Sequence, residues 1–340
     1  MKQQRFFHID FLRAVAVLAF IVTHVFSYHL TNPFNEFVWN YSHFQIVAFV
    51  FCSGYVMYFL YKDAFTTVSQ IFSWYAKRLT RLILPFYYYL FFHYILLLLF
   101  PAFFSGPGLV KSADSFFQSV MLFGGVNTNW LPLLFVELAL LFPVLLLLQQ
   151  KKLLLIYAVL SFSSLIFFSI VQFPYAYYRF VMWFPWSCFF LLAWYFAKQE
   201  TSSVHIKKYL MLSAIGGITF IFLFFLWHLF HKPLNLIDNK YPPNLFDASY
   251  EACVTFFLTA IGFCAFWQKL LISSVISFIS RNSYSLFFVH YIVADFFLSL
   301  QKILNVSYNV FEELLLVILV SLAISYILEK TMLLIRKVPS

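Results

Sequence analysis

Charged side chains are scarce in this chain of 340 residues. Asp, Glu, Lys and Arg make up 10% of the sequence, whereas 63% of the residues are hydrophobic and 23% are aromatic. No soluble domain of this length needs so much apolar surface, so the composition excludes a soluble globular protein. The apolar runs are continuous rather than alternating, which favours membrane-spanning helices over the strands of a membrane β-barrel. The sequence therefore predicts an all-α, polytopic membrane protein.

Cysteine is also scarce, and its placement excludes two kinds of site. The four cysteines lie within apolar runs and form no Cys-x-x-Cys pair. This pattern predicts small buried hydrophobic side chains rather than disulfides or metal ligands. Among the nine histidines, only His228 and His231 have a spacing typical of metal ligands, and no carboxylate lies near them. We therefore predict no metal site. The cysteines are Cys52, Cys188, Cys253 and Cys264.

Long apolar runs recur along the whole chain. The first run is too long for a cleaved signal peptide and is not followed by a small-residue cleavage site, so we expect it to be retained. No internal repeat is evident, and we predict a single integral-membrane domain over residues 1–340 with about ten transmembrane helices. The predicted helices are 11–30, 43–61, 82–100, 130–149, 153–171, 178–197, 208–230, 249–267, 282–300 and 311–335.

Lysine and arginine are distributed unevenly among the segments between these helices. Arg179, Lys208 and Lys330 lie toward the ends of predicted helices and are counted with the adjoining segments. With the N-terminus placed inside the cell, sixteen cations then belong to cytoplasmic segments and five to external segments. By the positive-inside rule, this imbalance predicts that both termini are cytoplasmic. Some of the cytoplasmic cations are expected to face anionic lipid headgroups. Topology thus accounts for the net charge of +9, and no nucleic-acid partner is needed.

The first predicted helix carries two ionisable groups, Arg13 and His24, within an otherwise apolar run. Eleven residues at roughly 100° each place their side chains within about 20° of each other, about 16 Å apart along the axis. Ionisable groups in membrane helices normally face a bundle interior or a wet cavity. Two interpretations of Arg13 remain open, because Asp10 lies three residues before it. It either forms an ion pair at the membrane edge or provides an anion site facing the cytoplasm.

Glu137 and Asp295 are predicted at a similar depth to His24, in the outer half of the membrane. A carboxylate beside an imidazole orients its tautomer and raises its basicity, which is the arrangement expected of a general base. The alternative is that Glu137 and His24 only form hydrogen bonds that help pack the bundle. His290, in the middle of the ninth predicted helix, is interpreted as a buried structural histidine.

Arginines also border two of the predicted helices on the cytoplasmic side. Arg78 and Arg81 are three residues apart, so on a helix they share a face and could bind phosphate groups together. Arg281 stands beside several hydroxyl side chains. Arginines flanking a membrane helix more often serve topology alone, and that alternative stays open here.

Five segments of the chain contain most of these polar residues. They are Asp10-Phe-Leu-Arg13 with His24, Phe49-Val-Phe-Cys-Ser53-Gly54-Tyr55, Lys77-Arg78-Leu-Thr-Arg81 with Pro85, Trp130 to Glu137 with Pro143, and Ser283-Tyr284-Ser285 to His290. Together they resemble the membrane-bound acyltransferase family 3, which includes bacterial sugar and peptidoglycan O-acetyltransferases. The resemblance covers nearly the whole chain, and the matching segments occur in the family's order. Two departures are Cys52 in the second segment and the apolar residues that follow Glu137.

The resemblance implies a cytoplasmic acyl-CoA donor, usually acetyl-CoA, and an acceptor hydroxyl presented in or across the membrane. It also implies that Arg13 and His24 are essential and that Arg78 and Arg81 help to hold the CoA. The two departures bear on the class of acceptor more than on acyl transfer itself.

We therefore predict an O-acyltransferase of the bacterial cytoplasmic membrane that acts on a cell-surface polysaccharide, peptidoglycan or a lipid-linked glycan. His24, assisted by Glu137 and Arg13, is the predicted catalytic group, and Arg78, Arg81, Arg281 and Arg13 are the predicted donor-binding residues. Either direct transfer or an acetyl-histidine intermediate at His24 fits the sequence. The alternative functions are a proton-coupled exporter of a glycan or organic acid and a non-catalytic partner in polysaccharide synthesis.

Overall fold

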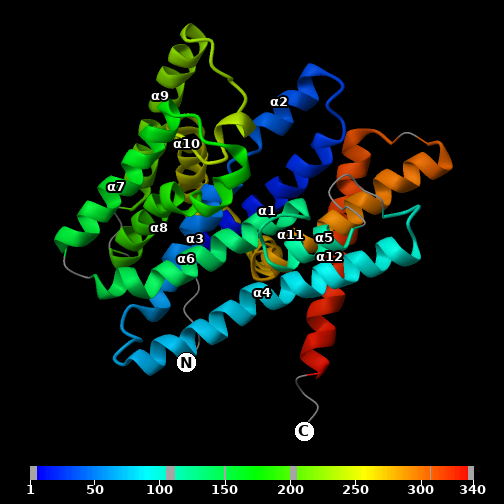
Figure 1. Cartoon of the computed structure of the whole chain (residues 1–340), viewed down its shortest axis with the longest axis horizontal. Helices are drawn as coiled ribbons and strands as arrows, with labels where there is room; N and C mark the ends of the chain where they lie inside the picture. Colours follow the sequence, from blue (N-terminus) through cyan, green and yellow to red (C-terminus); the bar gives the residue numbers. More distant parts are fainter. Residues whose placement is uncertain (1–5, 105–111, 149–150, 200–204, 307, 336–340) are drawn as a thin grey trace. The chain divides into compact units, whose positions relative to one another are not determined.

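The computed structural model describes residues 6–104, 112–148, 151–199, 205–306 and 308–335. Within these ranges the regular secondary structure is helical and contains no named strand, which confirms the predicted all-α class. The α-helices, drawn in Figure 1, are α1 (Phe7–Ser27), α2 (Pro33–Tyr41), α3 (Gln45–Tyr61), α4 (Val68–Leu99), α5 (Ala113–Val120), α6 (Trp130–Leu147), α7 (Lys151–Ile170), α8 (Trp183–Lys198), α9 (His205–Leu229), α10 (Leu245–Ile261), α11 (Leu270–Leu304) and α12 (Val310–Ile335).

In the described ranges, nine helical segments are long and apolar enough to cross a membrane. They correspond to nine of the ten predicted helices and confirm a polytopic membrane protein. The remaining prediction, 249–267, corresponds to α10, which has 17 residues and is therefore about 26 Å long. That length is at the lower limit for crossing the hydrocarbon core. The side of the membrane on which the termini lie stays a prediction of the charge distribution.

The chain divides into two compact units. The first unit comprises residues 1–42, 84–129 and 268–340, and the second comprises residues 43–83 and 130–267. Helix α4 contributes its first half to the second unit and its second half to the first. Pro85 lies inside α4 and removes one backbone donor from it, which membrane helices tolerate when their surroundings satisfy the freed carbonyl.

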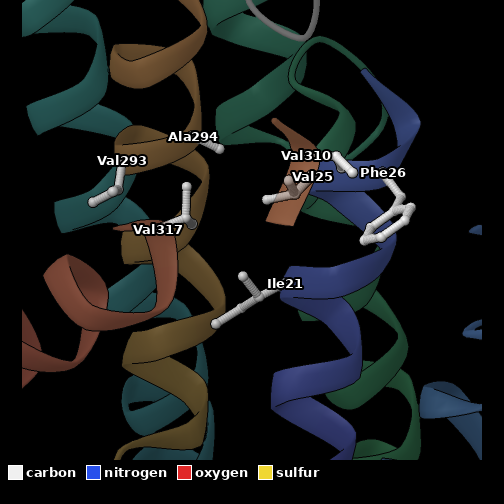
Figure 2. Packing of buried hydrophobic residues seen from close by; sticks show 7 residues of the cluster. All are labelled: Ile21, Val25, Phe26, Val293, Ala294, Val310 and Val317. Carbon is white, nitrogen blue, oxygen red and sulfur yellow. The ribbon is translucent and has the colours of Figure 1, made fainter. Parts of the chain in front are cut away.

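The core of the first unit forms where α1, α11 and α12 pack together. Ser280 of α11 donates a hydrogen bond of 2.6 Å to Asp10 near the start of α1, and Tyr28, just after α1, reaches Asp295 further along α11. The two helices therefore run parallel, and one face of α1 is held against α11 along its length. The buried apolar residues of this core, shown in Figure 2, are Ile21, Val25, Phe26, Val293, Ala294, Val310 and Val317.

The second unit is packed largely through aromatic rings. Phe51 of α3 makes edge-to-face contacts with Phe196 of α8 and Phe256 of α10, with ring centroids 6.1 and 5.4 Å apart. Phe196 in turn stacks on Tyr209 of α9 at 4.2 Å. Such contacts stabilise packing beyond the area they bury, because each ring's positive edge meets a negative face. Four helices are thereby fixed around one cluster.

Two adjacent glycines of α9 provide a test of the packing against α10. A Cβ at Gly216 would lie 2.9 Å from the Cys253 nitrogen and the Ser249 oxygen, whereas one at Gly217 would meet Cys253 Sγ at 3.2 Å. Gly216→Ala should therefore lower the free energy of unfolding by about 1–3 kcal/mol, because the α10 backbone must move. Gly217→Ala should be neutral or slightly stabilising, because it displaces only a thiol and gains roughly 0.5–1 kcal/mol of helix propensity. Thermal unfolding in detergent measures both, and equal effects would contradict this close approach.

Candidate functional site

His24 lies in the last turn of α1, and its imidazole is half-buried against α11. Its Nδ1 lies 2.8 Å from Nε2 of His290, and its Nε2 lies 2.6 Å from the hydroxyl oxygen of Tyr291. His290 is fully buried, and its own Nδ1 lies 2.9 Å from the carbonyl oxygen of Leu286 in the same helix. Both ring nitrogens of His24 are thus hydrogen-bonded to α11, which fixes the plane of the imidazole.

Aromatic rings cover the imidazole on the side of the preceding helical turn. The ring of Phe20, four residues before His24, lies nearly parallel to the imidazole with centroids 6.0 Å apart. Phe287 of α11 contacts Phe20 edge to face at 5.1 Å, and both phenylalanines are buried. Hydrogen bonds in such apolar surroundings are electrostatically stronger than the same bonds in water.

A second polar cluster lies one turn further along α11. Asp295 Oδ2 is 3.2 Å from His93 Nε2 of α4, and Asp295 Oδ1 accepts from the Tyr28 hydroxyl at 3.5 Å. Tyr89 lies one turn before His93, and its hydroxyl oxygen is 3.1 Å from His93 Nδ1. Tyr28 follows the apolar span Phe7–Ser27, and burial together with the Asp295 carboxylate raises the pKa of its hydroxyl above its usual range. Tyr28 therefore remains a hydrogen-bond donor at neutral pH.

The opposite end of α1 carries Asp10 and Arg13. Asp10 accepts a hydrogen bond from Ser280, while the half-buried Arg13 forms no hydrogen bond or ion pair with any residue that the structure describes. The first interpretation of Arg13, an ion pair with Asp10, therefore does not agree with the structure. The first unit thus has polar groups at three levels along α1 and α11, at Asp10, at His24 and at Tyr28.

The second unit contains a basic pocket of about 270 Å³ beside the first half of α4. Lys77, Arg78 and Arg81 contribute its three cations, and Trp74 and Tyr61 contribute aromatic rings. Arg78 donates a 3.4 Å hydrogen bond from Nη2 to Ser53 of α3, which orients its guanidinium. Guanidinium groups can bind phosphate through two parallel hydrogen bonds, and an aromatic ring that lines a pocket can pack against a planar base. Tyr61 is half-buried and Trp74 is buried, so Tyr61 is the more accessible of the two rings. This combination of side chains suits a phosphorylated aromatic ligand.

The remaining predicted site residues lie in different parts of the two units. Glu137 is half-buried in α6 of the second unit, and its Oε2 is buried without a hydrogen-bond partner among the described residues. The predicted pairing of Glu137 with His24 would join the two units and stays a prediction. Arg281 belongs to the first unit, where its Nε lies 3.6 Å from Glu329 Oε1 of α12. Asn282 donates to the other oxygen of Glu329 at 3.1 Å, so Arg281 has a local structural partner.

The family model of acyltransferase family 3, described as an acyltransferase domain, matches residues 6–330. The chain belongs to acyltransferase family 3. It is therefore a membrane acyltransferase, as the order of its sequence segments predicted. No curated protein and no solved structure matches the chain significantly. In the part of the chain that the structure describes, no three His, Cys, Asp or Glu side chains are grouped so that they could hold a metal ion.

The segments that carry the resemblance to acyltransferase family 3 have visible structural roles. Ser53 contacts Arg78 in the basic pocket, and Gly54 brings α3 close to α8. A Cβ at Gly54 would lie 2.7 Å from the Phe190 carbonyl oxygen, so only glycine fits there without a backbone shift. The last segment places His290 directly against His24.

The sequence analysis did not predict that His290 and Tyr291 contact His24. One signal was available, because Ser280 and Tyr291 are eleven residues apart, the same spacing as Arg13 and His24. Such a spacing defines one stripe on a helix. Tyr291 of this stripe contacts His24 of α1, but a single sequence does not specify how two helices are rotated against each other.

Proposed function

We propose that this membrane acyltransferase transfers an acetyl group from acetyl-CoA to a hydroxyl group of a cell-surface polysaccharide, peptidoglycan or a lipid-linked glycan in the bacterial cytoplasmic membrane. The observation that carries the choice of donor is the basic pocket of the second unit. CoA combines phosphate groups with a planar adenine, and the pocket combines three cations with Trp74 and Tyr61. His24 supports the choice of reaction, because its imidazole is oriented by two hydrogen bonds within a helix long enough to cross the membrane.

In the proposed reaction, His24 Nε2 takes the proton of the acceptor hydroxyl while the hydroxyl oxygen attacks the thioester carbonyl. The carbon–sulfur bond then breaks, and the proton passes from His24 to the thiolate, which leaves as the free thiol of CoA. The proposal includes Arg13 as a cation for the donor and Glu137 as a carboxylate that assists His24. An acetyl-histidine at His24 is the alternative route. Isolation of acetylated enzyme after incubation with acetyl-CoA alone would favour it over direct transfer.

The experiment that tests the function combines a cellular and a purified assay. Mass spectrometry of surface glycans should show a lost acetyl mass in a strain without the gene, and the wild-type gene should restore it. Purified enzyme in lipid nanodiscs should convert labelled acetyl-CoA to free CoA when the acceptor fraction is added. An unchanged acyl content in the deletion strain would overturn the proposal.

Replacement of both pocket arginines, Arg78→Ala with Arg81→Ala, should weaken acetyl-CoA binding by about 30- to 100-fold. Each lost charge-assisted hydrogen bond removes roughly 1.5–3 kcal/mol, and part of this loss is recovered by solvent and by Lys77. The difference from wild type should be largest at low salt, because screening reduces the contribution of the guanidinium groups. Calorimetric titration with acetyl-CoA measures it. The control, Lys198→Ala with Lys207→Ala, removes two exposed cations outside the pocket and should leave the affinity within about twofold.

A second candidate function, proton-coupled export of a glycan or organic acid, is favoured by the three polar levels along α1 and α11. Ionisable groups within membrane helices often mark a transport path. Proteoliposomes distinguish the two functions. Movement of substrate by protein that neither binds nor hydrolyses acetyl-CoA would support export, whereas donor turnover without movement would support acyl transfer.

A further inference from the structure

We infer that His290 is a positioning residue, which holds His24 in the tautomer with its proton on Nδ1 and leaves Nε2 as the proton acceptor. The role of Nε2 as a base rests on the proposed function. The tautomer itself rests only on hydrogen bonds within the first unit.

The Leu286 carbonyl oxygen can only accept a hydrogen bond. It lies 2.9 Å from His290 Nδ1, so the hydrogen of the neutral His290 ring must be on Nδ1. With the opposite tautomer, the lone pair of His290 Nδ1 would face a lone pair of the carbonyl oxygen at this distance. The buried Nδ1 would then be an acceptor without a donor, which costs free energy. His290 Nε2 is therefore an acceptor.

The acceptor on His290 determines which nitrogen of His24 carries the hydrogen. Its Nδ1 lies 2.8 Å from the accepting Nε2 of His290, so Nδ1 of His24 carries the hydrogen. Its Nε2 consequently bears a lone pair, and the Tyr291 hydroxyl donates to it at 2.6 Å. The order of donors and acceptors is thus determined from Leu286 through His290 and His24 to Tyr291.

This arrangement also accommodates the reaction. When His24 takes a proton on Nε2, its Nδ1–H bond to His290 is unchanged, and the new N–H can donate to the Tyr291 oxygen. His290 is fully buried and Phe287 contacts it at a centroid distance of 5.8 Å, so solvent does not compete for its Nε2. The base is therefore pre-oriented before the substrate binds, which reduces the reorganisation that the reaction requires.

Nitrogen NMR of the full-length enzyme with ¹⁵N-labelled histidine tests the tautomer directly. The signals of His24 are assigned by their loss in His24→Gln. In the wild type, Nδ1 should give the signal of a protonated nitrogen and Nε2 that of an unprotonated one. The reverse assignment would overturn the inference, and this result needs no acceptor or activity.

Two variants of His290 and one control separate positioning from packing. His290→Leu keeps an apolar side chain but removes the acceptor, so His24 should become a mixture of tautomers. His290→Gln places an amide oxygen near the position of Nε2 and should retain the Nδ1–H tautomer. Tyr291→Phe removes the other hydrogen bond of His24 and should also leave the proton on Nδ1. A His24 tautomer unchanged in His290→Leu would overturn the inference.

Activity then connects the tautomer to catalysis. His290→Leu should lower kcat by about 10- to 10⁴-fold with KM for acetyl-CoA within twofold, because losses between roughly 10-fold and 10⁴-fold are found when the partner that orients a functional histidine is removed. His290→Gln should restore kcat to within about fivefold of the wild type. Equal losses in both variants at equal thermal stability would overturn the positioning role. If His24→Gln itself retains full transfer, the proposed function fails, while the nitrogen spectrum still decides the tautomer.

Discussion

Replacement of His24 by alanine should lower kcat for acyl transfer by about 10²- to 10⁴-fold, the range that general base catalysis contributes. In the proposed reaction, Nε2 of this imidazole takes the proton from the hydroxyl group of the acceptor glycan. Alanine has no group that could take this proton instead. Donor affinity should remain within about twofold of the wild type, because the proposed contacts to the CoA phosphates are made by Lys77, Arg78 and Arg81 of the basic pocket and not by His24. Initial rates with labelled acetyl-CoA and calorimetric binding of the donor measure the two effects separately.

The matched control for this experiment is His228→Ala, because His228 is an exposed histidine at the end of α9. It should change neither kcat nor donor affinity. If His24→Ala instead abolished donor binding and left the turnover of bound donor intact, His24 would be a donor-binding residue and not the base.

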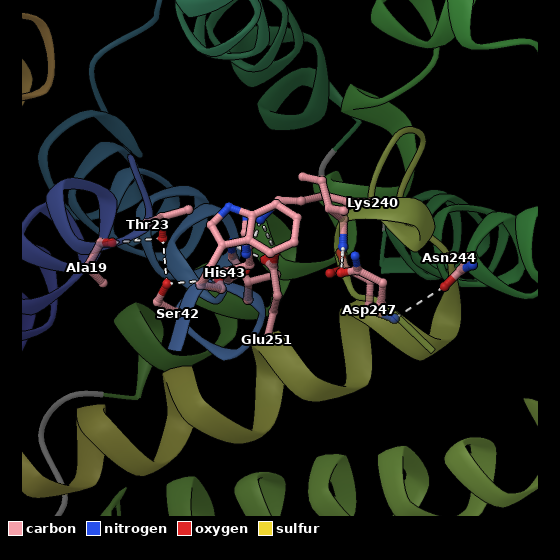
Figure 3. Close-up of polar contacts among 12 residues, drawn as sticks. Ala19, Thr23, Ser42, His43, Lys240, Asn244, Asp247 and Glu251 are labelled. Carbon is pink, nitrogen blue, oxygen red and sulfur yellow. Dashed lines mark hydrogen bonds and ion pairs between the residues drawn. The ribbon is translucent and has the colours of Figure 1, made fainter. Parts of the chain in front are cut away.

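Replacement of Lys240 by methionine should lower the free energy of unfolding by about 3–5 kcal/mol, the usual cost of removing one partner of a buried ion pair. Lys240 is 1% exposed, and its Nζ lies 3.0 Å from Glu251 Oε1 and donates to the His43 carbonyl oxygen at 2.9 Å. Figure 3 shows the lysine beside Glu251 and the equally buried Asp247. Methionine keeps the length of the side chain but leaves both carboxyl groups without their cation.

Thermal and chemical unfolding in detergent micelles measure this loss, and two further variants isolate its cause. Lys240→Met combined with Glu251→Gln should recover part of the stability, because the amide carries no charge that needs a partner. The control Lys198→Met removes an exposed lysine and should be within about 0.5 kcal/mol of the wild type. Equal effects of Lys240→Met and Lys198→Met would show that the buried pair does not stabilise the second unit.

The features that depend on composition and local spacing were predictable from the sequence. The apolar runs gave the all-α membrane class, and the eleven-residue interval in α1 placed Arg13 and His24 on one stripe. Helix α4 begins at Val68, earlier than the predicted start at residue 82, so Arg78 and Arg81 belong to the helix itself. The apolar run begins after these cations, whereas backbone hydrogen bonding continues through them.

The features that depend on long-range packing were not predictable from a single chain. His290 is 266 residues from His24, and its contact depends on how α11 is rotated against α1. Lys240 lies between the predicted helices 208–230 and 249–267, so it is one of the five cations that the charge distribution assigns to external segments. The structure buries it against Glu251. Both cases concern polar groups whose partners lie on another helix, and hydrophobic periodicity contains no information about such pairs.

If the proposed reaction is correct, the rings of Phe20 and Phe287 also affect how much of the acyl donor is lost to hydrolysis. A water molecule that reaches a thioester beside a general base can hydrolyse it, and each such hydrolysis consumes one acyl-CoA without acylating the acceptor. Phe20 covers the imidazole of His24 on one side, and the Tyr291 hydroxyl donates to its Nε2, so a water molecule must displace Tyr291 before it can be activated by this nitrogen. The same packing that orients His24 would thereby make donor consumption depend on the arrival of the acceptor.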